Sequence, residues 1–306
     1  MRNVFLTLSM CIPLCGFAQV FNVSSVDKVN IPVNPDAKVA AISPQGDYLL
    51  LSTAINTGLT KFDLTTSQTQ VLTEAPGAGY DVKISPNGKR VIYRKNSFTK
   101  DHLKKVSLQS LELTNGKSKE LVAPTRDLQG VQAEDATTAV VSNDKLAVKT
   151  TDGSKVKMST PMLSINNRQL MITRNGRTKL FSPNGKDNSY LWPSVSPDGT
   201  KVLYYVCGLG AYVCNIDGSN IKKIGTMRAP QWYNNGIVVG MNDQDDGEVI
   251  YASTIVAANL KGETQTLTDG KQIAMYPKVS PATGKIVFST PEGEVYIIHV
   301  TQYRQL

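Results

Sequence analysis

The stretch Ser196-Pro197-Asp198-Gly199, followed closely by the apolar run Val202–Tyr205, decides the fold of this chain. The same tetrapeptide with a variable third residue begins at Ser43 and at Ser85, and a looser copy begins at Ser280. Proline presets φ for the second position of a tight turn and glycine supplies a positive φ, so each copy predicts two strands joined by a turn. One hairpin cannot bury its apolar face alone, and the series therefore predicts repeated sheets packed on one another.

Alignment on these turns gives units of about four short strands. Clear units run from about 39 to 74, from 81 to 123 and from 192 to 225. Asn115-Gly116 and Asp217-Gly218 fall between the two outer strands of their units, where such dipeptides favour hairpins. No segment has a sustained helical period. Four-stranded sheets repeated around an axis form a β-propeller, which leaves only short, protected edges.

The number of blades depends on the irregular region between 126 and 188. Strands are expected there at 138–141, 146–149, 170–173 and 178–181, which fits one irregular blade with an insertion or two degenerate blades. We expect an all-β chain with a single propeller of six four-stranded blades, and seven blades as the alternative. Residues 20–26 are strand-like and the last repeat is short, so we expect the N-terminal strand to close the ring.

Residues 1–18 have the pattern of a signal peptide. Arg2 precedes the apolar stretch Val4–Leu14, and Gly16-Phe17-Ala18 places small residues before a cleavage site near Ala18. The propeller domain would then span 19–306, in a periplasmic or secreted protein. No later run reaches transmembrane length. The formal charge of +8 comes from scattered basic residues, and an exported protein has little access to nucleic acid, so we interpret this charge as favouring solubility or anionic envelope surfaces.

Two cysteines remain after the expected cleavage, Cys207 and Cys214. A two-residue turn at Gly210-Ala211 would place them opposite each other, and an oxidising compartment permits a disulfide. A shifted turn would separate them, and buried free cysteines are common.

The acidic segment 242–248 is the densest local cluster of charge. Its carboxylates, Asp243, Asp245 and Asp246, suit a calcium ion (Ca²⁺), although their spacing is not that of an EF-hand. The alternative is a polar Asp-Gly turn. No other cofactor is expected.

Aromatic residues gather just before the innermost strand of several units. These segments border one mouth of the expected channel, and aromatic side chains are favoured in binding surfaces. The alternative is core packing between blades. The candidate rim consists of Tyr80, Asp81, Tyr190, Trp192, Trp232 and Tyr276.

Recognisable catalytic groups are scarce. The two histidines, His102 and His299, lie in different repeats, and no Gly-x-Ser-x-Gly motif occurs. We therefore expect that the chain is not an enzyme. A carboxylate site that pairs Asp81 with Asp243 or Asp245 is the enzymatic alternative.

The Ser-Pro-x-Gly turns at Ser43, Ser85 and Ser196, with the strands that follow them, resemble the repeats of TolB-like, WD-repeat-like propellers. Such repeats also form the propeller domains of prolyl-oligopeptidase-type peptidases. The resemblance implies an exported protein that presents loops and a channel to a partner. We expect a monomeric, non-enzymatic module that binds an envelope protein or peptide and acts as a scaffold in a Gram-negative cell envelope. The alternative is a propeller that binds a glycan or a peptide through the aromatic rim.

Overall fold

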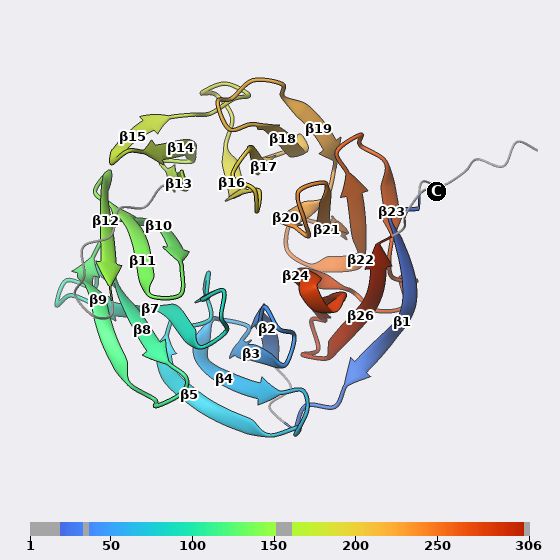
Figure 1. The fold of residues 1–306 in the computed structure, drawn as a ribbon, viewed down its shortest axis with the longest axis horizontal. Coiled ribbons are helices and arrows are strands. Elements are labelled where there is room, and N and C mark those ends of the chain that lie inside the picture. Colours follow the sequence, from blue (N-terminus) through green and yellow to red (C-terminus); the bar gives the residue numbers. More distant parts are fainter. Residues whose placement is uncertain (1–18, 33–36, 151–160, 303–306) are drawn as a thin grey trace, which may run out of the picture.

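The computed structural model describes residues 19–32, 37–150 and 161–302, which form an all-β propeller (Figure 1). The expected signal peptide, residues 1–18, lies outside the described residues. Six sheets surround a common axis, which confirms the six-blade prediction. In the part of the chain that the structure describes, no helix is long and apolar enough to cross a membrane.

Five blades are antiparallel sheets with four strands each. Blade 1 has β2 (Ala37–Ile42), β3 (Tyr48–Thr53), β4 (Thr57–Asp63) and β5 (Thr69–Pro76). Blade 2 has β6 (Lys83–Ile84), β7 (Arg90–Phe98), β8 (Lys104–Glu112) and β9 (Ser118–Thr125). Blade 4 has β16 (Tyr190–Val195), β17 (Lys201–Val206), β18 (Gly210–Asn215) and β19 (Lys222–Gly225). Blade 5 has β20 (Arg228–Trp232), β21 (Ile237–Asp245), β22 (Ile250–Asn259) and β23 (Thr264–Thr266).

Blade 6 joins the two ends of the described chain. Its strands are β24 (Met275–Ser280), β25 (Lys285–Ser289), β26 (Val295–Gln302) and the N-terminal β1 (Phe21–Val29), with the short 3-10 helix η1 (Pro281–Thr283) after β24. β1 pairs with β26 from Phe21↔Gln302 to Val29↔Val295. The prediction that the N-terminal strand closes the ring is confirmed.

Blade 3 is larger than expected. Its order is β10 (Leu128–Ala133), β11 (Thr137–Ser142), β12 (Lys145–Thr150), β15 (Arg177–Leu180), β14 (Gln169–Arg174) and β13 (Met162–Asn166). One residue pair, Lys145↔Arg177, joins its two three-stranded halves. β10 and β13 both lie at the inner side of the ring (Figure 1). The irregular region is therefore one sheet made of two degenerate units.

A buried serine hydroxyl organises each Ser-Pro-x-Gly turn. Ser85 Oγ accepts a hydrogen bond from the Arg90 amide at 3.0 Å and donates one to Asn87 Oδ1 at 2.7 Å. Ser196 does the same with the Lys201 amide and Asp198 Oδ1, at 2.9 and 2.6 Å. These bonds satisfy turn groups that would otherwise be buried without partners.

The same turns bind one blade to the next. The Asn87 amide donates to Asp135 Oδ1 at 2.7 Å, from blade 2 to blade 3. The Asp198 amide donates to Asn235 Oδ1 at 2.9 Å, from blade 4 to blade 5. Between blades 6 and 1, Ser280 Oγ donates to the Pro44 carbonyl at 2.9 Å. The turns thus form a belt of hydrogen bonds around one face of the ring.

Apolar cores fill the space between neighbouring blades. Leu50 of blade 1 packs in one cluster with Val91 of blade 2. Leu49 of blade 1 packs in another with Val287 of blade 6. A strand that is buried on both faces does not need to alternate apolar with polar residues, and this explains the continuous apolar runs after the turns.

Of the two alternatives for Cys207 and Cys214, the structure has the shifted turn, and both cysteines are free. The turn lies at 207–209, so Val206 pairs with Gly210 and Cys214 pairs with Val202. Gly210 serves a close approach within the sheet: a Cβ there would lie 2.4 Å from the Gly225 carbonyl oxygen. Burial raises the pKa of the Cys214 thiol to about 12.

Ring closure predicts the effect of truncating Phe21. Its side chain is fully buried and meets the Tyr233 ring edge to face at 4.7 Å. Phe21→Ala should lower the free energy of unfolding by about 3–5 kcal/mol. Val23→Ala, at a position 37 % exposed on the same strand, should cost less than about 1 kcal/mol. Urea unfolding measures both, and equal losses would contradict this role of β1.

Candidate functional site

The two faces of the ring carry different loops. In each four-stranded blade, the Ser-Pro face holds the turn after the first strand and the turn after the third. The opposite face, which we call the rim face, holds the turn between the second and third strands and the segment that leads into the innermost strand. This division follows from the antiparallel order of the strands.

Exposed apolar side chains gather on the rim face. Of the fourteen exposed large apolar side chains among the described residues, nine lie there, whereas Ile221 is the one in a turn of the Ser-Pro face. The other four lie on the outer strands β1, β5 and β15. The nine are Ile55, Tyr80, Phe98, Leu103, Leu191, Leu209, Val249, Tyr251 and Tyr276.

A repeated backbone bulge shapes the approach to the innermost strands. The pairing shifts within β16, β20 and β24, and at each shift one residue has a positive φ: Trp192 (48°), Ala229 (47°) and Tyr276 (50°). A left-handed conformation is costly for residues other than glycine, and bulges redirect side chains. Asp81, at the matching place before blade 2, has φ 50°. The repeated bulge therefore sets the direction in which these side chains point.

A hollow of about 660 Å³ opens on the rim face between blades 4 and 5. Trp192 and Tyr205 form one wall, with ring centroids 5.3 Å apart and planes at 65°. Arg228, Asp243 and Asp245 form the charged wall. An aromatic wall that faces fixed charges is typical of sites that bind a polar ligand.

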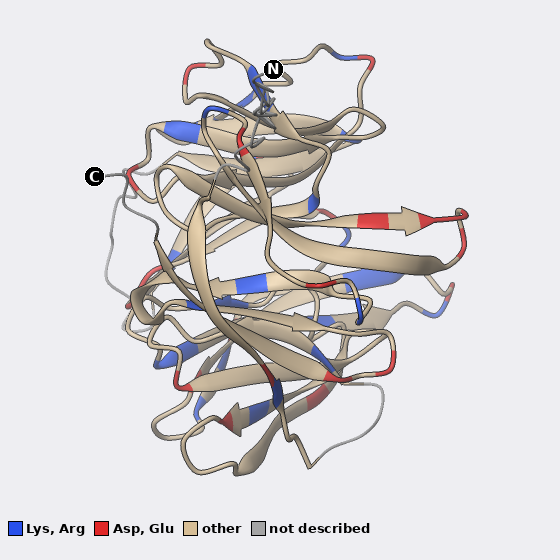
Figure 2. Cartoon of the chain, turned by 90° about the vertical axis from the view of Figure 1, so that its right-hand side faces the viewer, with Lys and Arg blue, Asp and Glu red and all other residues tan. Residues whose placement is uncertain are grey.

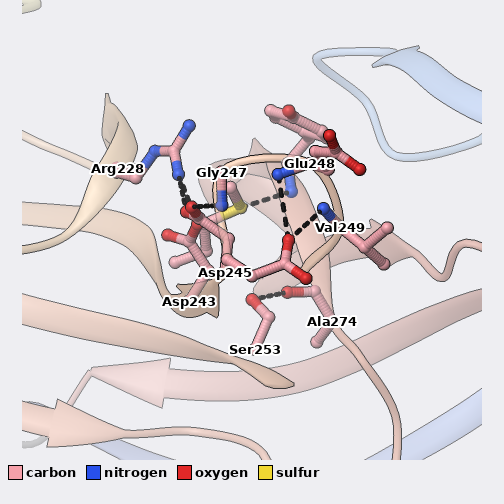
Figure 3. A network of polar contacts seen from close by, with 11 residues as sticks. Arg228, Asp243, Asp245, Gly247, Glu248, Val249, Ser253 and Ala274 are labelled. Atoms are coloured by element: carbon pink, nitrogen blue, oxygen red, sulfur yellow. Dashed lines mark hydrogen bonds and ion pairs between the residues drawn. The ribbon is translucent and has the colours of Figure 1, made fainter. Parts of the chain in front are cut away.

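One guanidinium holds the two carboxylates of the charged wall (Figure 3). Arg228 Nη1 lies 2.5 Å from Asp243 Oδ2 and 2.9 Å from Asp245 Oδ2. The Asp243 side chain is only 2 % exposed. Arg228 therefore neutralises a carboxylate that would be costly to bury alone.

The third acidic residue of this segment supports the turn. Asp246 Oδ1 accepts hydrogen bonds from the amides of Val249 and Glu248, and these bonds lower the pKa of its carboxyl. The described part of the chain has no group of three His, Cys, Asp or Glu side chains that could hold a metal. Calcium at Asp243, Asp245 and Asp246 stays a prediction; in the structure Arg228 already pairs with Asp243 and Asp245.

The hairpin of β21 and β22 carries these acidic residues outward. Seen from the side, it projects from the ring and is acidic toward its tip (Figure 2). It forms one side of the hollow, since Asn242 to Asp245 and Ala252 to Thr254 line it.

A second charged cluster surrounds Asp81 at blade 2. Asp81 Oδ1 lies 2.5 Å from Lys83 Nζ, and Asp81 Oδ2 lies 2.7 Å from Arg94 Nη1. Arg94 also lies over the Tyr80 ring at 5.4 Å. Burial alone would raise the pKa of Asp81, but the two cations lower it to about 2.

The structure divides the six predicted rim residues into two groups. Tyr80, Asp81, Trp192 and Tyr276 are accessible on the rim face. Tyr190 and Trp232 lie in the cores of blades 4 and 5, so their inclusion in the rim is corrected. Each bulge interrupts the regular alternation of side chains between the two faces of the strand. It therefore decides which aromatic residues near it are exposed and which are buried. Sequence reasoning missed Tyr205 and Arg228, although Arg228 directly precedes the bulge residue Ala229.

No family model matches the chain, and no curated protein is significantly similar to it. Several solved structures are similar. A streptogramin B lyase gives a TM-score of 0.60 at 11 % identity, over 93 % of this chain and 100 % of that one. The Cps50 (Swd1) β-propeller domain of Myceliophteria thermophila gives 0.57 at 13 %, over 90 % and 100 %. An oligogalacturonate lyase in complex with manganese gives 0.46 at 15 %, over 85 % and 76 %. The first two likenesses confirm the β-propeller fold.

The expectation that the chain is not an enzyme is contradicted by this comparison. The streptogramin B lyase is an enzyme and has the same overall fold. Neither the propeller fold nor the small number of histidines therefore excludes catalysis. The likeness is one of fold and gives no substrate.

The ion pair in the hollow predicts a stability effect. Arg228→Met leaves Asp243 buried without its cation and should lower the free energy of unfolding by about 2 kcal/mol. This is less than for a fully buried pair, because Arg228 is 35 % exposed. Arg228→Met combined with Asp243→Asn should recover most of the loss.

The matched control is Lys271→Met, which breaks the exposed pair with Asp269 and should cost less than about 0.5 kcal/mol. Urea unfolding of five proteins measures these effects: the unaltered chain, Arg228→Met, Asp243→Asn, the double variant and Lys271→Met. A double variant that loses as much as the sum of its two single variants would exclude the coupling.

Proposed function

We propose that the rim face binds another protein in the cell envelope. The observation that carries this proposal is the unequal distribution of exposed apolar side chains between the two faces. Large exposed apolar patches are unusual on a monomer and mark interaction sites. The Ser-Pro face, in contrast, uses its turn groups in hydrogen bonds between its own blades.

The hollow between blades 4 and 5 supplies a centre for this interface. Binding energy concentrates in pockets lined by aromatic residues and arginine, which Trp192, Tyr205 and Arg228 provide. Leu191 lines the hollow, Leu209 directly follows the lining residue Gly208, and both leucines are exposed. A partner that inserts an apolar or basic side chain would meet both the aromatic wall and the carboxylates.

The envelope location rests on the sequence. The signal-peptide pattern of residues 1–18 and the resemblance to TolB-like repeats both favour export across the inner membrane. The amides of Val20 and Phe21 donate to Gln265 Oε1 at 2.7 and 2.8 Å, so a chain cleaved before Gln19 keeps every bond that anchors β1 to blade 5.

A matched pair of variants tests the interface. Leu209 is 45 % exposed on the rim face and Ile221 is 44 % exposed on the Ser-Pro face. Leu209→Asp should weaken capture of the envelope partner at least tenfold, because it adds a charge beside the hollow. Ile221→Asp should leave capture within about twofold.

The measurement is a quantitative pull-down from envelope extract of the producing organism, with partners identified by mass spectrometry. The full chain and both variants are compared by their thermal unfolding midpoints to confirm folding. Equal capture by the two variants would contradict the proposal.

The second candidate is a glycan or peptide ligand in the same hollow. It is favoured by the Trp192 ring, which lines the same hollow as the carboxylates of Asp243 and Asp245. The chain has two tryptophans and the other, Trp232, is buried, so Trp232→Phe leaves Trp192 as the sole reporter. Fluorescence titration with envelope glycans and peptides should then give a saturable change. Trp192→Phe should give none, and an unchanged signal in the Trp232→Phe protein would exclude this candidate.

A further inference from the structure

The two longest hairpins of the four-stranded blades both belong to the rim face. In blade 2, β7 and β8 have nine residues each, and in blade 5, β21 and β22 have nine and ten. The second and third strands of blades 1, 4 and 6 have five to eight residues. The turn between the second and third strands lies on the rim face, so the additional length is found there.

Each of these hairpins ends in a two-stranded ribbon that extends past its own blade. Within the described residues, β6 does not pair with β7 beyond Ile92, and β9 does not pair with β8 before Val106. In the same way, β20 and β23 reach neither 242–245 of β21 nor 250–255 of β22. A ribbon that leaves its sheet presents its edges and its turn to other molecules.

The two ribbons carry opposite charge. Residues 95–105 of blade 2, the basic ribbon, contain four lysines and one aspartate. Residues 242–251 of blade 5, the acidic ribbon, contain four acidic residues and no lysine or arginine. Among the described residues, none of these four lysines is in an ion pair. The lysines are Lys95, Lys100, Lys104 and Lys105, and the acidic residues are Asp243, Asp245, Asp246 and Glu248.

Exposed apolar side chains accompany the charges on both ribbons. Phe98 and Leu103 are exposed on the basic ribbon, and Val249 and Tyr251 are exposed on the acidic ribbon. Protein interfaces combine apolar contact with complementary charge, which selects the partner and its orientation. Each ribbon is therefore complementary to the other, whereas two copies of the same ribbon would repel each other.

The two ribbons of one chain cannot meet, because they belong to opposite sides of the ring. Blades 1 and 6 lie between them on one side, and blades 3 and 4 on the other (Figure 1). A second copy can bring them together when its rim face is turned toward the first. In a two-fold symmetric pair, a contact between the basic ribbon of one copy and the acidic ribbon of the other is made twice. A single symmetry operation thus pairs all four ribbons.

We propose that this chain forms a two-fold symmetric dimer through its rim faces, with the basic ribbon of each copy bound to the acidic ribbon of the other. This inference rests on the proposed function, because it names a second copy of the chain as the partner of the rim face. It departs from the monomer expected from the sequence. The acidic ribbon forms one side of the hollow between blades 4 and 5, so the lysines of the second copy supply basic groups that the hollow suits.

Sedimentation velocity of the full chain over a range of protein concentrations tests the dimer. The unaltered chain should dimerise in about 50 mM sodium chloride, and its dissociation constant should rise about tenfold or more in about 500 mM, because salt screens exposed charges. Lys100→Glu combined with Lys104→Glu should weaken the dimer at least about tenfold. The matched control is Lys222→Glu combined with Lys223→Glu on the outer strand β19. It makes the same change of charge away from the ribbons and should stay within about twofold.

A mixing experiment separates the contact between ribbons from a general effect of charge. Gln244→Lys combined with Glu248→Lys reduces the negative charge of the acidic ribbon and should weaken self-association by a similar factor. An equimolar mixture of the two ribbon variants should associate at least about threefold more tightly than either variant alone, because their heterodimer keeps one unaltered contact. Thermal unfolding midpoints confirm that each variant is folded.

Two results would overturn the dimer: a chain that stays monomeric at every concentration up to about 0.2 mM, or a mixture that associates no more tightly than its components. The proposed function is tested separately, because Leu209 lies in neither ribbon. A monomeric chain whose capture of an envelope protein is lost in Leu209→Asp uses its rim face for a different partner. Equal capture by Leu209→Asp and Ile221→Asp contradicts the proposed function, whatever the oligomeric state.

Discussion

The buried serine hydroxyl in each Ser-Pro-x-Gly turn is the interaction on which the ring depends. It closes the turn between the first two strands of a blade, as Ser85 does with Arg90 and Asn87. It thereby fixes the third turn residue, whose amide reaches the next blade. Arg90, fully buried, adds hydrogen bonds to Thr138 Oγ1 and to the carbonyls of Glu134 and Thr137. Local turn chemistry and the angle between blades are therefore set by the same groups.

This arrangement assigns different tasks to the two faces. The turns of the Ser-Pro face make hydrogen bonds to neighbouring blades, so folding constrains their sequence. The rim face carries longer hairpins, such as β21–β22, and the repeated backbone bulges that include Trp192 and Tyr276. Loops on a rigid scaffold can vary without loss of the fold. The proposed binding groups therefore lie on the face whose loops are free to vary.

Much of the fold follows from sequence because its signals are local. The turns at Ser43, Ser85 and Ser196 locate the strands, and the strand-like residues 20–26 foretell the closure. The site depends on tertiary geometry, and sequence could not give it. The pairing of Arg228 with Asp243 joins neighbouring strands through a bulge, and that bulge also decides that Trp192 is accessible while Tyr190 is buried. The sequence predicts a turn at Gly210, whereas Gly210 begins β18, because its close approach to Gly225 leaves no mark in the sequence.

Closure by β1 and β26 also has a consequence for the timing of folding. The pair joins Phe21 to Gln302, so the first strand of the chain waits for the last one before its ladder can form. Contacts of such long sequence separation slow folding, since the loop must close before they stabilise it. Until β26 is in place, the outer edge of β25 has no strand to pair with and β1 cannot join blade 6. The completed ring is thus a state reached only by the whole polypeptide, and a chain stalled short of β26 remains an open arc with an unpaired edge.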